Sequence, residues 1–375
     1  MRHSRAILRP LVLAAVVTCV GCAGGKLDPI KPAELPADLP PELLQKFQIQ
    51  EEGKAPAGQA AAPMAPTGAL PTGTTASTSP VPPPPHHKKK KRQKPFKFRE
   101  LKLDKPLIRE GEQQTYDITY FGMLAGTFTL EAMPSKIIND RKVYYIRGHA
   151  QSSKVFSLFY SLDDVVETFI DQAGMFSHRF HLTLDETKQS RDSLELFDSE
   201  KKETFYWDRW NHRDKGYHEN RKFFPVDTPF SQDSLSALYF LRALPLKDGQ
   251  VYKVPVVSQG KNWEAEVHVV RREIRDTPVG TLPTVVVKPL TKYNGVLKQS
   301  GDSFLWLTDD DRHILLRMEA KVKIGGVTAE LVEWKPGHDP DPDEGAAEAI
   351  KEVASPIGGP PSEGAAPESK PATAE

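Results

Sequence analysis

The chain has 375 residues, and 50 Lys and Arg residues balance 50 Asp and Glu residues, so the formal net charge is zero. Its two cysteines, Cys19 and Cys22, both lie in the first 22 residues. The remainder therefore has no disulfide framework and no thiol for catalysis or metal binding. A domain of more than about 200 residues buries enough apolar surface to fold without such crosslinks.

Residues 1–22 have the features of an export signal. Three arginines precede an apolar run of about ten residues, which is too short to span a bilayer and typical of a signal peptide. The run ends at Gly21-Cys22-Ala23, which resembles the lipobox of bacterial lipoproteins with cleavage before Cys22. We predict that Cys22 is lipidated; the alternative is a secretory peptide that is cut nearby without a lipid. Ala23 stands where Asp would favour the inner membrane, so the resemblance implies the outer membrane, facing the periplasm.

Residues 23–98 are rich in Ala, Pro, Gly, Thr and Ser, which predicts a disordered linker. As a flexible coil of about 70 residues, this tether would average roughly 45–50 Å end to end. Near its end lies a cationic run, which is either a solvated charge run or a contact site for an anionic envelope surface. Export argues against nucleic acid as its partner. The candidate surface-binding residues are Lys88, Lys89, Lys90, Lys91 and Arg92. An acidic tail, residues 337–375, is also predicted to be disordered.

Residues 99–336 are predicted to form one β-rich globular domain. Apolar and polar residues alternate with a period of two in many short runs, and turn residues separate the runs. In the clearest case, the alternation of residues 316–324 is followed by Gly325-Gly326, which predicts a tight two-residue hairpin. Residues 154–162 predict a second short helix or an apolar loop at the rim of the sheet. The other strand candidates are the two halves of 115–132, then 142–152, 163–170, 176–184, 190–197, 203–210, 251–258, 263–272, 282–288, 303–308 and 327–334.

Residues 225–246 contain the one convincing helix. Ser231 or Asp233 is suited to cap its start, and Pro245 ends it. Apolar residues cover most of its circumference, which predicts a buried helix, with a wet side limited to Ser234, Ser236 and Arg242. It either fills the core or forms a lid over an apolar cavity. A buried helix among many strands predicts a mainly β fold, a large curved antiparallel sheet or half-barrel with one buried helix.

A search for catalytic chemistry gives no candidate. The chain has no serine elbow, no zinc-protease motif and no phosphate-binding loop, so we predict no catalytic residue, no metal and no cofactor. The carboxylates of Asp309-Asp310-Asp311 fit a hairpin turn better than a calcium loop. Inward positions around the helix remain as candidates for lining a ligand cavity. They are Leu235, Leu238, Leu241, Tyr239, His178 and Phe180.

Three stretches together resemble a known family. They are YDITYFGMLAGTFTLE near the start of the domain, PFSQDSLSALYFLRALPLKDGQVY around the helix, and FLWLTDDDRHILLRMEAKVKIGGVTAELVEW at its end. They resemble the bacterial domain-of-unknown-function family numbered 3108 over residues 110–334. Members are exported or lipid-anchored envelope proteins, and the resemblance brings no activity and no catalytic residues.

The leading hypothesis is therefore an envelope lipoprotein that binds an apolar or amphiphilic envelope molecule, such as an acyl-type ligand, or a partner protein. The alternative is a structural or interaction lipoprotein with a solid core. An undetected hydrolase is the third. An aliphatic cavity would favour the first, a packed core the second, and a cleft with convergent carboxylates and histidine the third.

Overall fold

The computed structural model describes residues 27–32, 35–52, 95–103, 106–294, 296–297, 302–321 and 325–338. The predicted lipidation site Cys22, the basic run at 88–92 and residues 339–375 of the predicted acidic tail lie outside these residues, so what the sequence predicts for them stays a prediction. The first two residues of that predicted tail, Gly337 and His338, instead belong to strand β16 (Gly326–His338). Within the described residues, no helix is long and apolar enough to cross a membrane.

In the part of the chain that the structure describes, sixteen strands form one sheet, and every ladder between them is antiparallel. They are β1 (Gln50–Glu51), β2 (Glu110–Tyr120), β3 (Met123–Ile138), β4 (Arg141–Ser152), β5 (Asp163–Asp171), β6 (Ser177–Asp185), β7 (Gln189–Asp198), β8 (Glu203–His212), β9 (Gly216–Pro225), β10 (Val251–Ser258), β11 (Lys261–Thr277), β12 (Gly280–Tyr293), β13 (Val296–Leu297), β14 (Ser303–Thr308), β15 (Leu315–Lys321) and β16 (Gly326–His338). The order across the sheet is β10-β11-β12-β14-β15-β16-β2-β3-β4-β5-β6-β7-β8-β9, with β1 added to β3 and β13 to β12.

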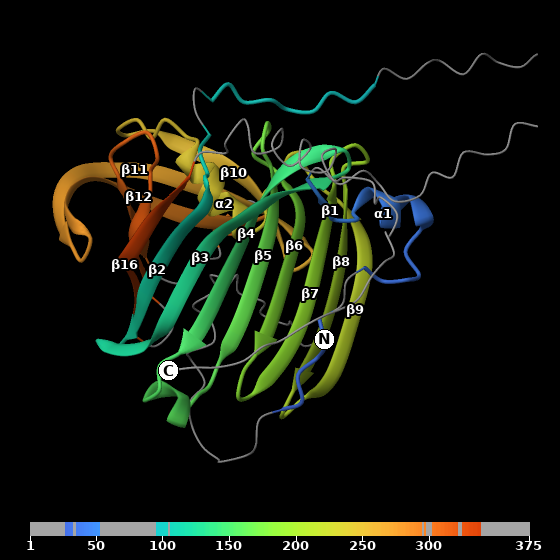
Figure 1. Ribbon diagram of the computed structural model, residues 1–375, viewed down its shortest axis with the longest axis horizontal. Helices are drawn as coiled ribbons and strands as arrows, with labels where there is room; N and C mark the ends of the chain where they lie inside the picture. Colours follow the sequence, from blue (N-terminus) through green and yellow to red (C-terminus); the bar gives the residue numbers. More distant parts are fainter. Residues whose placement is uncertain are drawn as a thin grey trace, which may run out of the picture. The chain divides into compact units, whose positions relative to one another are not determined.

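Three short helices in the described residues accompany the sheet: α1 (Pro41–Lys46), the 3-10 helix η2 (Phe156–Leu158) and α2 (Ser236–Arg242). The prediction of a mainly β, antiparallel fold with one buried helix is confirmed, because α2 packs its apolar residues into the main core. Figure 1 shows α2 beside β10, and η2 at the opposite end of the strands.

The sheet is strongly curved, as Figure 1 shows for β2 to β9. Register shifts interrupt the ladders of β2 with β3, β3 with β4, β5 with β6, β11 with β12, β14 with β15 and β16 with β2. Bulges of this kind bend a strand and increase its twist. Among the described residues no ladder joins β9 to β10, so the sheet is not closed into a barrel. The two edges nevertheless approach, because the Asn262 side chain donates to the Pro225 carbonyl oxygen at 3.0 Å.

Buried apolar residues form two separate clusters. The main core lies between α2 and one face of the sheet, where the inward-pointing residues of most strands meet. A second cluster includes Leu194 and Leu196 of β7, whose neighbours Glu195 and Phe197 point to the other face. Three residues of the N-terminal segment, Leu39, Leu43 and Phe47, complete this second cluster.

The N-terminal segment corrects part of the linker prediction. Residues 35–52 were assigned to a disordered linker, but they form α1 and β1 and pack on the sheet. The physical reason is the spacing of Leu39, Leu43 and Phe47 at every fourth residue, which places three apolar side chains on one face. Most of the rest of the predicted linker, residues 53–94, lies outside the described residues.

Two further expectations need correction. Strand β9 was not predicted, because its charged residues are exposed on both faces and leave no apolar alternation to detect. The final hairpin does not turn at Gly325-Gly326 as predicted, because Gly326 pairs with Lys321 in the ladder between β15 and β16. Gly325 has a φ of 80° and lies so close to Phe121 that an added Cβ would be 2.7 Å from its ring. That close approach explains the glycine.

Candidate ligand-binding cavity

A cavity of about 300 Å³ lies between α2 and the inner face of the sheet. Its walls come from α2 and from strands β2, β3, β5, β10, β11, β12, β14, β15 and β16. Because strand side chains alternate between the faces, most of these strands contribute residues two apart, such as Tyr116 and Ile118 of β2 or Val254 and Val256 of β10. The chain thus builds one apolar space from segments as far apart as residues 116 and 329.

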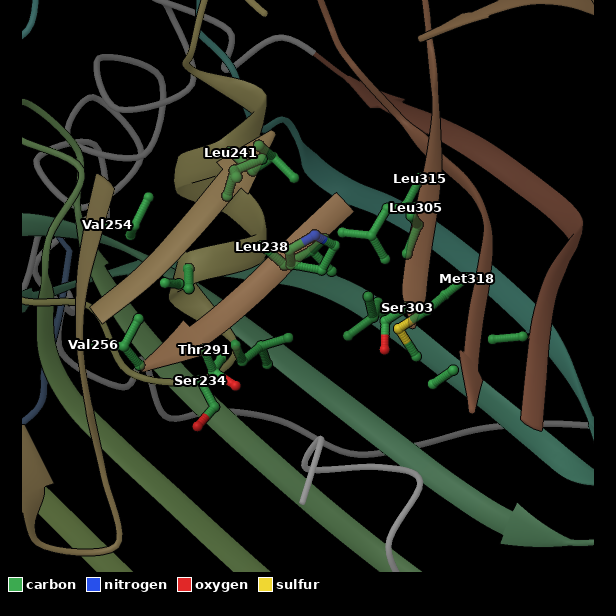
Figure 2. A pocket seen from close by; sticks show the side chains of 18 of the residues that line it. Ser234, Leu238, Leu241, Val254, Val256, Thr291, Ser303, Leu305, Leu315 and Met318 are labelled. Carbon is green, nitrogen blue, oxygen red and sulfur yellow. The ribbon is translucent and has the colours of Figure 1, made fainter. Parts of the chain in front are cut away.

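The lining is almost entirely aliphatic. Figure 2 shows Leu238 and Leu241 of α2 facing Leu305 and Leu315 across the cavity, with Met318 further along. An apolar space of this kind does not hold water well, because water needs two to four polar partners. The arrangement suits an apolar ligand, with shape and burial as the source of affinity.

A buried polar network closes the end of the cavity at Tyr116. The Tyr116 hydroxyl lies 2.6 Å from Gln114 Oε1 and 2.9 Å from the Leu315 carbonyl oxygen, and Gln114 donates to Glu112. Burial raises the pKa of Tyr116 well above its ordinary value, so the phenol stays neutral. These bonds satisfy the hydroxyl of Tyr116, a residue that lines the cavity.

The same network holds the end of α2. Arg242 Nη1 lies 2.6 Å from Glu112 Oε1, and the guanidinium also donates to the carbonyl oxygens of Leu107 and Arg312. Burial alone would lower the pKa of Arg242, but the adjacent Glu112 carboxylate outweighs it and raises that pKa. Arg242 was predicted to lie on the wet side of the helix, and this is wrong. Its charge is buried because Glu112, 130 residues away in sequence, pairs with it.

Asp233 fixes the start of α2 on the sheet. Its carboxylate accepts hydrogen bonds from the N–H groups of Leu235 and Ser236, both at 2.7 Å. It also accepts from the hydroxyls of Thr168 on β5 at 2.5 Å and Ser177 at the start of β6 at 2.6 Å. Burial raises the pKa of Asp233, although these four bonds oppose the rise. The capping role predicted for Asp233 is therefore present, whereas Ser236 is buried rather than on a wet side.

The lining is less buried on one side. Leu241, Leu315 and Tyr116 are buried, whereas Thr291 and Ser303 are only half-buried. Together with Ser234, which bonds to Ser258 at 3.0 Å, they bring three hydroxyls to this side. Figure 2 shows the three hydroxyl side chains on the same side of the cavity, away from Leu241 and Leu315. A ligand with an apolar tail and a polar end would find partners for both.

Three of the six predicted cavity residues, Leu235, Leu238 and Leu241, line this cavity. Tyr239 and Phe180 instead pack within the main core. His178 is buried elsewhere, with Nε2 3.0 Å from Asp171 Oδ2. These three lie outside the cavity, because alternation alone does not tell which part of a face the helix covers.

Sequence reasoning missed the strand residues that form most of the wall, including the hydroxyl-bearing residues Thr291 and Ser303. The sequence does contain a signal for these hydroxyl-bearing residues, in the row of inward-facing residues on each strand. Ser303 precedes Leu305 and Leu307 on β14, and Thr291 follows Val287 and Pro289 on β12, so each hydroxyl ends an apolar row. A polar residue ending such a row marks where the inner face meets solvent.

The acidic run that the sequence analysis assigned to a hairpin turn makes contacts within that turn. Asp310 accepts from Thr308 and from the N–H groups of Arg312 and His313, as expected of the turn between β14 and β15. Among the described residues, no group of three or more His, Cys, Asp or Glu side chains is arranged to hold a metal ion.

Comparison with known proteins gives a family and distant structural similarity. The family described as "Protein of unknown function (DUF3108)" matches residues 115–332. A β-barrel-like protein of domain of unknown function DUF1849 from Brucella abortus is 13% identical, with a TM-score of 0.41, covering 62% of this chain and 100% of that one. A protein from Bacteroides fragilis, proposed to be exported and described as having a YmcC-like fold, is 10% identical, with a TM-score of 0.29 and coverage of 61% and 97%.

A protein from Parabacteroides distasonis, proposed to be a lipoprotein, is 11% identical, with a TM-score of 0.28 and coverage of 61% and 98%. A search of curated protein sequences gives no match. At these identities and TM-scores, the similarities carry no inference about ligand, activity or location. The site must therefore be interpreted from its own geometry.

Proposed function

For this chain, which belongs to the DUF3108 family of proteins of unknown function, we propose a role as an envelope lipoprotein that binds an amphiphilic molecule by its acyl chain. The cavity between α2 and the sheet carries the proposal: about 300 Å³ of aliphatic space with three hydroxyls on its less buried side. The lipobox-like sequence before Cys22 supports a lipid anchor, and Ala23 supports the outer membrane, facing the periplasm.

The size of the cavity supports a single chain. Small-molecule sites range over about 300–1,000 Å³, so this cavity lies at the small end and suits one acyl chain better than a whole multi-chain lipid. Burying about ten methylenes contributes about 8 kcal/mol before the entropic costs of association are subtracted. We therefore expect a dissociation constant in about the micromolar range or weaker.

Binding rather than catalysis is proposed, because the reactive groups next to the cavity are already engaged. The Asp233 carboxylate accepts four hydrogen bonds, and the Tyr116 hydroxyl contacts two acceptors. The rest of the lining consists mainly of aliphatic side chains and includes the hydroxyl-bearing side chains of Thr291 and Ser303. These contribute affinity and orientation.

The test is a titration of the delipidated protein with a fluorescent fatty acid. Leu238→Trp should fill the cavity and lower the affinity at least tenfold, because Leu238 of α2 points into it. Phe240→Trp is the matched control on the same helix. Phe240 packs over Arg99 and does not line the cavity, so its variant should bind within about twofold of the wild type.

Saturable binding that Leu238→Trp leaves unchanged would contradict this cavity as the site. A wild-type protein that shows no saturable binding would favour the alternative of a structural lipoprotein. Where binding is saturable and Leu238→Trp weakens it, native mass spectrometry of the protein purified from its own envelope would identify the natural ligand by mass.

A further inference from the structure

Six large apolar side chains are exposed together at one end of the strands. Phe121, Met123 and Leu124 belong to the β2–β3 turn, while Val155, Leu158 and Phe159 surround η2. Each is between 47% and 80% exposed. We call these six residues the apolar rim. Single exposed apolar residues are normal on a protein surface, but a cluster of this kind marks an interaction site.

Hydrogen bonds hold the two parts of the apolar rim together. Ser153, just before η2, donates its N–H to the Ala125 carbonyl oxygen at 2.8 Å and its hydroxyl to the Leu124 carbonyl oxygen at 2.9 Å. Figure 1 shows the β2–β3 turn and η2 at the same end of the sheet. The rim is therefore one fixed surface, made of two loop tips that project beyond the strands.

The N-terminal segment begins at this same end. The Ile30 N–H donates to Ser190 Oγ at 2.7 Å, at the start of β7. The turn before β7 in turn bonds to the segment after η2, because the Thr187 N–H donates to the Ser161 carbonyl oxygen at 2.9 Å. Ser161 follows Phe159 by two residues. The described chain thus starts close to the apolar rim.

Chain length then ties the rim to the predicted anchor. Cys22 precedes Ile30 by eight residues, which span at most about 29 Å when fully extended. The Pro-rich stretch and the basic run at 88–92 lie after β1 in the sequence, so they do not separate Cys22 from Ile30. A lipid on Cys22 would hold this end of the sheet near the bilayer surface.

We propose that the apolar rim is a membrane-contacting surface, and that it turns the less buried side of the cavity toward the bilayer that holds the anchor. The side chains of Leu158 and Phe159 enter the interfacial region of the bilayer. Ser303 pairs with Ala320, near the hairpin whose Gly325 touches Phe121, so the hydroxyl side of the cavity adjoins the rim. This orientation, which rests on the proposed acyl binding, lets a chain pass between membrane and cavity.

The experiment uses the full mature chain with Cys22→Ala, so that no lipid contributes, and zwitterionic vesicles of phosphatidylcholine and phosphatidylethanolamine at high salt. High salt suppresses attraction by the basic run, whereas apolar insertion persists. The parent protein, the Cys22→Ala chain with the unchanged apolar rim, should cosediment with the vesicles. The double variant Leu158→Ser, Phe159→Ser should reduce vesicle partitioning at least tenfold.

The matched control is Val270→Ser, Ile274→Ser, which removes two exposed apolar side chains from β11, away from the rim. Its partitioning onto the vesicles should stay within about twofold of the parent. Both double variants should keep the melting temperature of the parent. Equal vesicle binding by both double variants, or no binding by the parent, would overturn the membrane contact and leave a protein partner as the occupant.

Failure of the proposed acyl binding can be told apart from failure of the membrane contact, because fatty-acid titration in solution needs no membrane. If acyl binding fails in solution while the rim still binds vesicles, the cavity proposal is wrong and the membrane contact stands. If the rim variant binds fatty acid in solution but extracts it from vesicles at least tenfold more slowly than its parent does, acyl binding and transfer through the rim are both supported. Equal extraction rates for the rim variant and its parent would overturn transfer through the rim.

Discussion

Glu195 is a buried carboxyl that links two parts of the sheet far apart in strand order. It lies on β7, and its Oε1 accepts the N–H of Gly260, at the β10–β11 turn, at 2.9 Å. Burial raises the pKa of Glu195 to about 7, and the nearby Asp233 adds to the rise, while the Gly260 N–H and Arg191 oppose it. The group therefore titrates near neutral pH.

The sign of the linkage follows from this raised pKa. An unfolded glutamate has a pKa of about 4.3, so between about pH 4.5 and 7 the folded chain keeps a proton that the unfolded chain has lost. The stability from Glu195 is full below this window and is lost as pH rises through it, by up to about 3.5 kcal/mol in total.

Glu195→Gln should remove this dependence while keeping the hydrogen bond to Gly260. Urea unfolding at pH 5 and pH 8 measures it. The wild type should lose about 3 kcal/mol more than the variant between the two values. Because Asp164, whose burial raises its pKa to about 8, is present in both proteins, its contribution cancels. Equal losses would mean that Glu195 titrates normally.

Single residues also mark where sequence reasoning ends. Arg242 and Ser236 looked solvent-exposed because their helical positions leave a polar arc, yet both are buried. Their partners decide this: Ser236 bonds to Asp233, three residues away, but Arg242 pairs with Glu112 on β2. A local pattern does not contain a partner 130 residues away, so the burial of such a charge could not be predicted from the helix alone.

Helix α2 is the element that forms the cavity, and Asp233 positions it. Asp233→Ala would leave the Thr168 and Ser177 hydroxyls and two N–H groups without their acceptor, at a cost of about 3 kcal/mol. Fatty-acid affinity should fall with it, because Leu235 and Leu238 depend on the helix position. Urea unfolding and the titration above measure both effects.

Asp233→Asn is the control for this prediction. Asn caps helices about as well as Asp, and the hydroxyls of Thr168 and Ser177 can rotate to accept from its amide, so the loss should be about 1 kcal/mol. An alanine variant as stable as the asparagine variant would contradict the positioning role of Asp233.

Elements with strong periodicity were predictable from the sequence, and those without it were not. The strands that became β4 to β8, β10 to β12 and β14 to β16 alternate clearly, and α2 shows its capping residue and Pro245. Strand β9 lacks alternation because both faces are exposed, and α1 is only six residues long. Helices this short gain their stability from tertiary contacts, here through Leu43 and Phe47.

At the scale of the whole molecule, the docked N-terminal segment changes the length of the tether. With residues 35–52 packed on the sheet, the chain between Cys22 and the first described residue, Leu27, is four residues long. If the segment were detached, about 70 residues would separate Cys22 from the domain, with an average span of roughly 45–50 Å. If Cys22 carries the proposed lipid, docking sets how far the domain lies from the membrane.

Detaching the segment should move the lipidated domain away from the bilayer. In Leu43→Asp, Phe47→Asp, two charges replace side chains that are 7% and 1% exposed, which should release the segment because burying a charge is costly. The background carries Leu158→Ser and Phe159→Ser, so that the rim does not itself hold the domain. Energy transfer from a dye on an introduced Lys154→Cys to a membrane dye should fall markedly.

Gln45→Asp, Gln48→Asp is the matched control, because it adds the same two charges at exposed positions of the same segment. It should keep the energy transfer of the background protein. Cys22→Ala should abolish transfer and release the protein into the soluble fraction, which checks the lipid anchor independently. Equal transfer from the detached variant and its control, with the Cys22→Ala protein soluble, would mean that docking of residues 35–52 does not set the distance, and the Pro-rich stretch would regain the role of tether.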